Sequence, residues 1–414
     1  MKYIFFCTII FVLPFFSCRL MTNDNNKNSD KEPSYKASIV WESNTNVISF
    51  PSDIAIADSN VYVYENTESE EVISFRLSKL NAKTGEVMWR TESFSKWPSC
   101  PPQIIGEYAY VFLFQSSLIH SYDIETGKLA AIIETDTENN GMEIESNPIV
   151  YGNYLFFGIY NGPMGSYLAR LDVTTIDYSK NHSEFQFIDP EIIWVPELGG
   201  FAWTEPIIRN NVIYCRSYAG ITSDDPIELA GINMDTKQVV FHQRIDYDNG
   251  QEHYPLLIHE DIIYILGHSL SAYNLNTGEQ LFLKTFTGAE PDNEWYAAIF
   301  SSLGKVYHKG KIYYTNSYSD VICIDAKTGK LAWKERVPLV ESLGTNPIIV
   351  NDKMYVPYAG GLRVYDTNTG KLIGVDKSFE GHGQGKNILY NNYMIAVKHD
   401  SSGIGKVVAI NLGG

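Results

Sequence analysis

A turn signature recurs along this chain and restricts its fold more than any other feature. The signature is an Asp or Asn, then a Thr three positions later and a Gly directly after it. The copies start at Asn81, Asp123, Asn274, Asp325 and Asp366, with degraded copies at Asp172 and Asn233. The Asp or Asn oxygen can accept hydrogen bonds from N–H groups two or three residues on, and Gly tolerates a positive φ, so each copy predicts a tight hairpin. Neighbouring copies lie 41 to 61 residues apart, a period typical of β-propeller blades.

A second repeat marks where the units begin. A proline precedes a short stretch with two apolar residues and, four and five positions after the proline, a polar turn pair; this occurs at Pro102, Pro148, Pro206, Pro255 and Pro347. Proline cannot donate to a β-ladder, so it is tolerated at the start of a strand or on an edge, such as the edge that faces a propeller channel. Lys305 and Asn387 take this position in two further units.

These repeats give eight units, starting near residues 52, 101, 147, 203, 253, 304, 345 and 387. The last unit stops at Asn411, where its outer hairpin should begin, so its outermost strand is missing. The N-terminal stretch Ser38–Glu42 matches the outer strand around Trp89 and has no inner strands of its own. Because a ring must close to cover its edges, we expect an all-β, eight-bladed β-propeller over residues 37–414. Its blades would be four-stranded and antiparallel, with residues 37–43 completing the last one.

The first 36 residues have a different character. Residues 3–16 form an almost unbroken apolar run, too short to span a bilayer but suited to a signal peptide. Cys18 stands where this run meets a polar stretch, which resembles a bacterial lipoprotein signal. We expect residues 1–17 to be the lipoprotein signal peptide, Cys18 to carry the lipid, and residues 18–36 to form a flexible tether. The alternative is an ordinary signal peptide in which Cys18 has no special role.

Charge and cysteine content narrow the partners and the chemistry. The chain has 32 basic and 49 acidic residues and a net charge of -17, so nucleic-acid phosphates would be repelled and no nucleic-acid partner is expected. Beyond the signal and Cys18, the chain keeps Cys100, Cys215 and Cys323, and three thiols cannot all pair within one chain. Cys215 and Cys323 lie in apolar strand patterns and are expected to be buried.

The turn-and-strand sequence Asp-x-x-Thr-Gly-Lys-x-x-Trp resembles the repeats of the quinoprotein-like (PQQ-like) β-propellers, most clearly at residues 80–90, 324–334 and 365–371. An insertion at about 173–190 separates the third hairpin from a candidate outer strand, Glu191–Trp194. A lipoprotein with eight such blades is similar to the BamB family of outer-membrane assembly lipoproteins. That resemblance implies a scaffold in the bacterial cell envelope, an outer-membrane lipoprotein on either side of that membrane, with the β-barrel assembly machinery as its protein partner.

Enzymes share this repeat, so it specifies architecture better than function. The enzyme resemblance implies a PQQ cofactor, a Ca²⁺ ion, a catalytic Asp and a disulfide between adjacent cysteines. This chain has no Cys-Cys pair, and Glu205 and Asn147 each precede an inner-strand proline. The segment 136–147 departs from an EF-hand at its third and twelfth positions, and the nine histidines lack a metal-ligand spacing. We therefore expect no catalytic residue, no metal and no cofactor.

The seven tryptophans fall into two groups. Trp41, Trp89, Trp194 and Trp333 stand at the repeat position of an outer strand and are expected to fill the gaps between blades. The other three lie off the repeat, in connections that propeller geometry places on one face. Together with nearby residues they predict a partner- or ligand-binding face: Trp97, Trp203, Trp295, Tyr296, Tyr254, Glu205 and Asn346. The alternative is that these rings pack beneath the connections.

The sequence thus predicts a non-catalytic, lipid-anchored propeller that binds a protein partner. Two alternatives remain open. The first is a propeller that binds a glycan or another small ligand on the same aromatic face. The second is a PQQ-dependent dehydrogenase.

Overall fold

The computed structural model describes most of the chain beyond its first 31 residues. The described ranges are 32–47, 54–67, 74–114, 116–135, 143–144, 147–160, 166–182, 184–196, 200–201, 206–218, 227–245, 256–266, 269–285, 305–315, 320–337, 346–358, 360–379, 387–399 and 405–412. The predicted signal peptide and Cys18 lie outside them and stay predictions. Pro33–Gly414 forms one compact unit, which contains all of the described strands.

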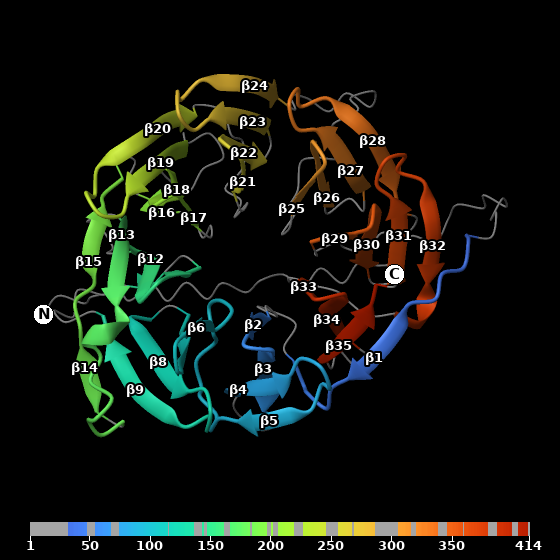
Figure 1. Ribbon diagram of the computed structural model, residues 1–414. Coiled ribbons are helices and arrows are strands. Elements are labelled where there is room, and N and C mark those ends of the chain that lie inside the picture. The colour runs from blue at the N-terminus through green and yellow to red at the C-terminus, as the bar shows by residue number, and fades with distance from the viewer. Residues whose placement is uncertain are drawn as a thin grey trace, which may run out of the picture. The chain divides into compact units, whose positions relative to one another are not determined.

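The described residues form eight sheets, which stand around a ring as the blades of a propeller (Figure 1). Strands are given from the inner to the outer edge of each blade. Blade one contains β2 Ala55–Ala57, β3 Asn60–Thr67, β4 Ser74–Asn81 and β5 Val87–Arg90, and blade two contains β6 Gln103–Ile105, β7 Tyr108–Phe112, β8 Leu118–Asp123 and β9 Leu129–Glu134. Blade three contains β11 Ile149–Tyr151, β12 Tyr154–Tyr160, β13 Ser166–Asp172 and β15 Glu191–Trp194, and blade four contains β17 Ile207–Arg209, β18 Val212–Tyr218, β19 Ile227–Asn233 and β20 Val239–Ile245.

The last four blades have the same order. Blade five contains β21 Leu257–His259, β22 Ile262–Leu266, β23 Ser269–Asn274 and β24 Gln280–Thr285, and blade six contains β25 Lys305–His308, β26 Lys311–Thr315, β27 Asp320–Asp325 and β28 Leu331–Arg336. Blade seven contains β29 Ile348–Val350, β30 Lys353–Tyr358, β31 Gly361–Asp366 and β32 Leu372–Asp376, and blade eight contains β33 Ile388–Tyr390, β34 Tyr393–His399, β35 Gly405–Asn411 and β1 Ser38–Glu42. The N-terminal strand β1 pairs antiparallel with β35. The predicted eight-bladed fold and its closure by this strand are therefore confirmed.

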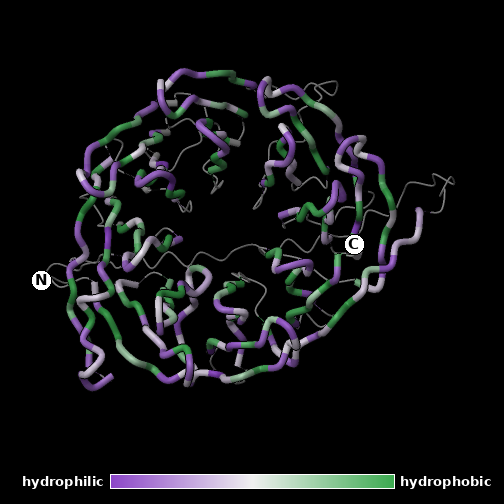
Figure 2. Tube along the Cα trace, in the orientation of Figure 1, coloured by the Kyte–Doolittle hydropathy of each residue, from purple (hydrophilic) through white to green (hydrophobic). Residues whose placement is uncertain are grey.

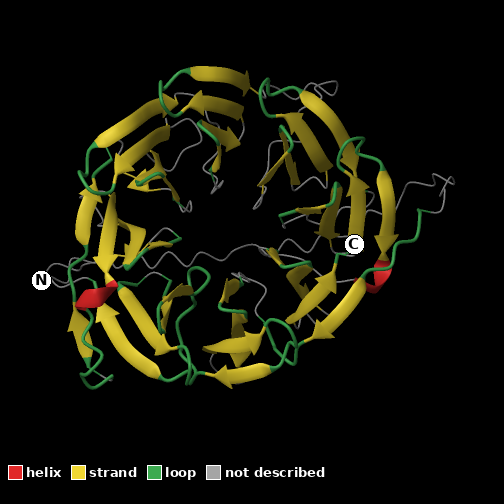
Figure 3. Ribbon diagram, in the orientation of Figure 1, coloured by secondary structure: helices red, strands yellow, loops and turns green. Residues whose placement is uncertain are grey.

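Three blades carry an additional strand. β14 (Phe185–Phe187) pairs with β9 on the outer edge of blade two, while β10 (Glu143–Ile144) and β16 (Gly200–Phe201) extend blades three and four. Figure 3 shows strands throughout the ring, with two short 3-10 helices, η2 (Val173–Thr175) and η4 (Lys377–Phe379). None of the described helices has the length and apolarity needed to cross a membrane.

The recurring turn has the geometry that its residues predict. In the first copy, the Asn81 Oδ1 accepts hydrogen bonds from the N–H groups of Lys83 and Thr84 at 2.9 and 3.1 Å. Gly85 closes the turn with a φ of +73°. Four prolines of the second repeat stand directly before inner strands and so remove no ladder hydrogen bond: Pro102, Pro148, Pro206 and Pro347. Pro255 lies outside the described residues.

The core lies between the blades. Each main cluster of buried side chains joins two neighbouring sheets, as Tyr313 and Val321 of blade six do with Met354 and Val356 of blade seven. Figure 2 shows hydrophobic stretches along the strands of the blades. The faces of adjacent sheets therefore bury each other, and the ring holds only if every gap between blades is filled.

The N-terminal end of the compact unit includes residues that the sequence analysis assigned to the tether. The compact unit begins at Pro33, four residues before the predicted start at 37. Tyr35 N–H donates to Val375 O at 3.0 Å, and Val375 N–H donates to Pro33 O at 2.9 Å. Residues 33–36 thus lie along β32 of blade seven before the chain enters β1, because their backbone groups find partners on the outer edge of that blade.

Candidate partner-binding face and its supporting contacts

Trp97 lies in the connection from blade one to blade two. Its side chain is 41% exposed, and its ring centroid lies 4.6 Å from that of Phe75 on β4. Trp97 O accepts a hydrogen bond from Phe114 N–H at 2.7 Å, which fixes the connection against blade two. The structure thus presents a partly exposed indole on a packed aromatic support.

His120 belongs to the aromatic layer beneath this site. Its ring meets Phe94 edge-on at 6.1 Å, and Phe94 in turn packs against Phe75. Burial, assisted by the positive charge of Lys96, lowers the pKa of His120 to about 4. The imidazole is therefore neutral at physiological pH and acts as part of an uncharged support for Trp97.

Asn346, a second predicted face residue, is engaged by the neighbouring blade. Its Nδ2 donates to Asn387 O at 2.9 Å, and its Oδ1 accepts from Asn387 N–H at 2.6 Å. Asn387 Nδ2 returns a hydrogen bond to Asn346 O at 2.8 Å. This reciprocal pair fastens blade seven to blade eight, a role that sequence reasoning missed. The signal was Asn387 itself, which replaces the inner-strand proline.

Trp97 and Asn346 lie at different blades, and the structure does not bring them together. The other predicted face residues lie outside the described residues: Trp203, Glu205, Tyr254, Trp295 and Tyr296. The candidate face consequently rests on Trp97 and its support.

The repeat tryptophans connect blades through the turns. Trp333 Nε1 donates to Thr367 O at 3.1 Å, and the ring lies against Gly370, where a Cβ atom would be 2.5 Å from Trp333 Cδ2. Thr367, whose carbonyl accepts this hydrogen bond, directly follows Asp366, the first residue of the turn in blade seven. Equivalent contacts are made by Trp41 with Ala82 and Gly85, and by Trp89 with Ile124 and Gly127. The turn glycines thus serve the packing between blades as well as the hairpin.

Trp194 does not occupy the repeat position, contrary to the sequence prediction. In blade one, Trp89 pairs with Lys79, two residues before the turn Asn. The corresponding residue of blade three, Arg170, pairs with Glu191. Trp194 lies three residues further along β15, beyond a register shift, and is buried between blades three and four. The strand assignment was right, but the insertion removed the spacing from which the register could be counted.

Polar groups replace the tryptophan contact at this junction. Glu191 forms ion pairs with Arg170 and with Lys237, which stands where other turns have Gly. Arg170 Nη1 donates to Met234 O at 3.4 Å, the carbonyl that follows the turn Asn. A cation therefore reaches the same turn position that an indole N–H reaches elsewhere.

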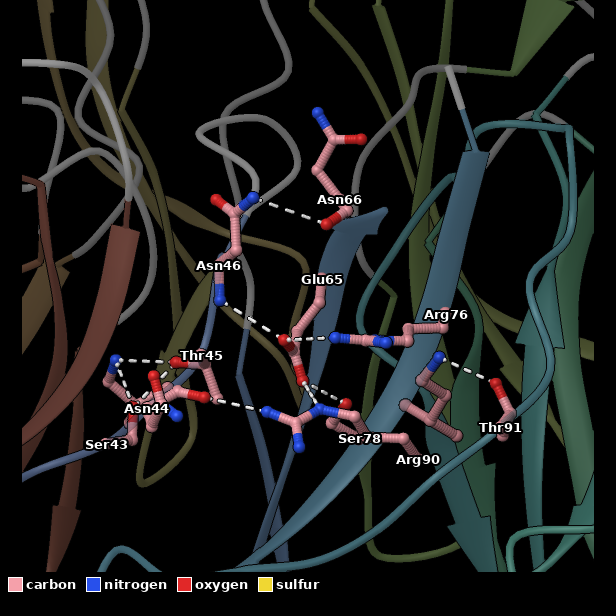
Figure 4. Close-up of polar contacts among 12 residues, drawn as sticks. Ser43, Asn44, Thr45, Asn46, Glu65, Asn66, Arg76, Ser78, Arg90 and Thr91 are labelled. Atoms are coloured by element: carbon pink, nitrogen blue, oxygen red, sulfur yellow. Dashed lines mark hydrogen bonds and ion pairs between the residues drawn. The ribbon is translucent and has the colours of Figure 1, made fainter. Parts of the chain in front are cut away.

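Glu65 of β3 forms a buried ionic centre near the closing strand (Figure 4). Its side chain is 1% exposed and accepts hydrogen bonds from Ser78, Arg90, Arg76 and the N–H of Asn46. Burial alone would raise its pKa, but these hydrogen bonds outweigh burial and hold the pKa of Glu65 below its ordinary value. The carboxylate is therefore ionised and fully partnered.

This centre ties the closing segment to both of its neighbours. Arg90 Nη2 donates to Asn44 O at 2.7 Å. Val47 forms bridges with Glu65 of blade one and with Gly405 of blade eight. The segment after β1 is thus held between the first and last blades, at the point where the ring closes.

The described residues contain no side-chain cluster suited to the Ca²⁺ ion of a quinoprotein centre. Two further buried carboxylates, Glu228 and Asp320, have basic partners in their own blades, His242 at 2.8 Å and Arg336 at 2.9 Å. Across the described ranges, no group of three or more His, Cys, Asp and Glu side chains is arranged to hold a metal ion. Among the described residues, three buried cysteines form no disulfide: Cys100, Cys215 and Cys323. The predicted burial of the latter two is confirmed.

Fold and repeat together define an eight-bladed propeller of the quinoprotein-like class. A family model described as "Outer membrane protein assembly factor BamB" matches residues 36–182 and 266–413. The match covers more than half of the chain, and the protein belongs to this family.

Individual proteins resemble the chain over shorter stretches. Residue identity is 35% over 80 residues with the lanthanide-dependent methanol dehydrogenase of Methylacidiphilum fumariolicum (strain SolV), covering 17% of this chain and 13% of that protein. It is 31% over 81 residues with BamB of Taylorella asinigenitalis (strain MCE3), covering 19% and 21%. The chain thus spans a small part of each relative's length.

The fold is shared more widely than the sequence. The crystal structure of BamB from Moraxella catarrhalis matches with a TM-score of 0.59 at 14% identity, covering 92% of this chain and 99% of that one. At this identity, the likeness concerns the fold alone.

Proposed function

We propose that this protein is a non-catalytic, lipid-anchored scaffold of the bacterial outer membrane, which binds a protein partner through the face that bears Trp97. The observation that carries the proposal is the exposure of Trp97 on its support of Phe75, Phe94 and His120. Rigid, partly exposed aromatic side chains dominate protein-binding surfaces because they bury a large area at little entropic cost.

Family membership supports the choice of partner. The description of the family names outer-membrane protein assembly, and a BamB relative shares local sequence with this chain. We therefore propose a component of the β-barrel assembly machinery as the partner. Three buried carboxylates, those of Glu65, Glu228 and Asp320, each form a hydrogen bond with a basic side chain of the same blade, which supports a structural role for them.

Site-specific crosslinking tests this proposal. A photoreactive amino acid replaces Trp97 in the full chain, which is expressed in the source bacterium, and crosslinking is carried out on its membranes. A second variant carries the same group at Met88, an exposed position on β5, the outer strand of blade one that precedes the Trp97 connection. We expect a barrel-assembly component to crosslink at position 97 and not at position 88. Absence of such a component at position 97, or equal recovery from both positions, overturns the proposal.

A PQQ-dependent dehydrogenase is the second candidate, favoured by the local similarity to a methanol dehydrogenase. Purified protein is mixed with PQQ and Ca²⁺, and both cofactor binding and alcohol-dependent dye reduction are measured. We expect neither. Saturable PQQ binding together with dye reduction would establish the enzyme and displace the scaffold proposal.

A further inference from the structure

The outermost strand of blade two has an inverted polarity pattern. In β14, Gln186 is buried, while Phe185 and Phe187 are 51% and 64% exposed. A strand that covers a core normally turns its apolar residues inward and its polar residues outward. Here the sequence places two large aromatic side chains in solvent, although burying them would stabilise the fold.

Gln186 fixes this orientation. Its Oε1 accepts from Asp177 N–H, and its Nε2 donates to Asp177 O, both at 2.9 Å. Rotating the strand to bury the phenylalanines would turn Gln186 outward and break both of these hydrogen bonds. The outward position of the two rings is therefore built into the strand.

One backbone edge of β14 pairs with no strand of the described part of the chain. The strand forms the end of its sheet and runs parallel to β9, on the outer rim in Figure 1. Ile188 N–H donates to Glu134 O at 3.0 Å, so the backbone N–H and C=O groups of Ile188 and of Gln186, two residues earlier, face β9. Because a parallel ladder alternates, the N–H and C=O groups of Phe185 and Phe187 face away from the sheet. This edge can accept another strand, with the two rings as side-chain contacts.

The protein already uses strand addition of this kind. At blade seven, residues 33–35 lie parallel to the outer strand β32 and exchange hydrogen bonds with Val375. An extended segment can thus add to the outer edge of a blade in this fold. At blade two the insertion has supplied β14, and no strand of the described residues pairs with its outer side.

The acidic residues beside β14 indicate which kind of segment can pair with it. Exposed Glu184 precedes β14 and exposed Asp189 stands two residues after it. Antiparallel pairing of two copies of β14 would bring these acidic residues toward each other, in a chain of net charge -17. We infer that β14 is a strand-addition site for an extended segment of another protein, with apolar residues alternating with basic ones. This site is distinct from the Trp97 face and goes beyond the scaffold proposal.

A synthetic peptide tests the site directly. The probe is a fluorescent nonapeptide of alternating Val and Lys, titrated against the full-length protein and measured by anisotropy. We expect saturable binding that weakens at least tenfold in the double variant Phe185→Ser, Phe187→Ser. The matched control is Leu281→Ser, Leu283→Ser, which removes an exposed apolar pair at the same spacing on the outer strand β24 of blade five. We expect this control to bind like the wild type.

Two further peptides test the backbone and charge requirements. Replacing two Val by Pro removes backbone donors, and replacing Lys by Glu reverses the charge; both changes should abolish binding. No binding of the Val-Lys peptide, equal binding by the Phe variant, or equal binding of the Pro peptide overturns the inference. So does a dimer in sedimentation that the Phe variant abolishes, since the occupant would then be a second copy. Crosslinking at position 97 is measured in the same Phe variant, so failure of this site is distinguished from failure of the scaffold proposal.

Discussion

Tyr35 lies directly over Gly374. A Cβ atom on Gly374 would be 2.8 Å from Tyr35 Cβ and 3.0 Å from Pro33 O. Gly374 holds the position that carries Trp in blades one and six, since it pairs with Val364, two residues before the turn Asp. The N-terminal segment thus supplies a ring that the blade itself lacks, and Tyr35 meets Tyr355 edge-on at 6.4 Å.

Blade two also lacks a large side chain at the repeat position, and a different segment supplies the ring there. Ala131 stands at its repeat position, opposite Ser121. Tyr178, from the insertion after blade three's hairpin, donates or accepts a 2.7 Å hydrogen bond with Tyr110 and stacks on Tyr108 at 3.7 Å. In both blades an added segment brings a tyrosine to the gap that a small outer residue leaves open.

The contact at Gly374 predicts a specific cost for a side chain there. Gly374→Val should displace residues 33–35 and lose two backbone hydrogen bonds, destabilising the protein by about 1–3 kcal/mol. Chemical denaturation measures the loss, and limited proteolysis should cleave the N-terminal segment faster. Ile373→Val, at the exposed neighbouring position, should leave both unchanged. Equal proteolysis of the two variants would contradict the contact.

The turn glycines allow backbone strain to be separated from packing. Gly370 and Gly106 both have positive φ, at +73° and +57°, but only Gly370 faces an indole. Gly106→Ala should cost about 1–2 kcal/mol from backbone strain alone. Gly370→Ala should cost clearly more, because Trp333 has to move and its hydrogen bond to Thr367 weakens. Similar losses for both variants in urea unfolding would show that the Trp–Gly contact contributes little.

The Glu65 centre makes ring closure sensitive to acid. Its folded pKa lies below the ordinary value of 4.5, so its stabilisation is complete above that value and is lost as the pH falls through the folded pKa. Glu65→Gln should cost about 2–3 kcal/mol at pH 7 and flatten the acid limb of a stability–pH curve. Glu125→Gln, at a side chain that is 79% exposed, serves as the control. An unchanged acid limb in Glu65→Gln would argue against this role.

The polar junction between blades three and four predicts a nearly neutral substitution. Lys237 adopts a φ of +57°, which costs a non-glycine residue about 1 kcal/mol. Its exposed ion pair with Glu191 returns at most about 1 kcal/mol. Lys237→Gly should therefore change the free energy of unfolding by less than about 1 kcal/mol. The reciprocal change Gly329→Lys, against Phe282, should be strongly destabilising; thermal unfolding of both variants tests the contrast.

The predictable part of the structure is local. A turn such as Asn81 to Gly85 is specified by groups within five residues, and the alternating strands on either side of it need no distant partner. Eight such units also imply closure, which β1 achieves on β35. The candidate site was harder to predict from the sequence. The exposure of Trp97 depends on how its connection packs on Phe75, and the pairing of Asn346 with Asn387 joins residues 41 positions apart.

The sequence by itself therefore determined the hairpins, the number of blades and the strand that closes the ring, because each results from short-range hydrogen bonding or from counting repeats. Only the tertiary structure decided how each gap between blades is filled. Trp333 fills one gap, Arg170 and Glu191 connect another, and Tyr35 comes from the N-terminal segment to a third. The reason is physical: close packing requires every gap to be occupied, but it does not require the filling residue to come from a fixed place in the chain.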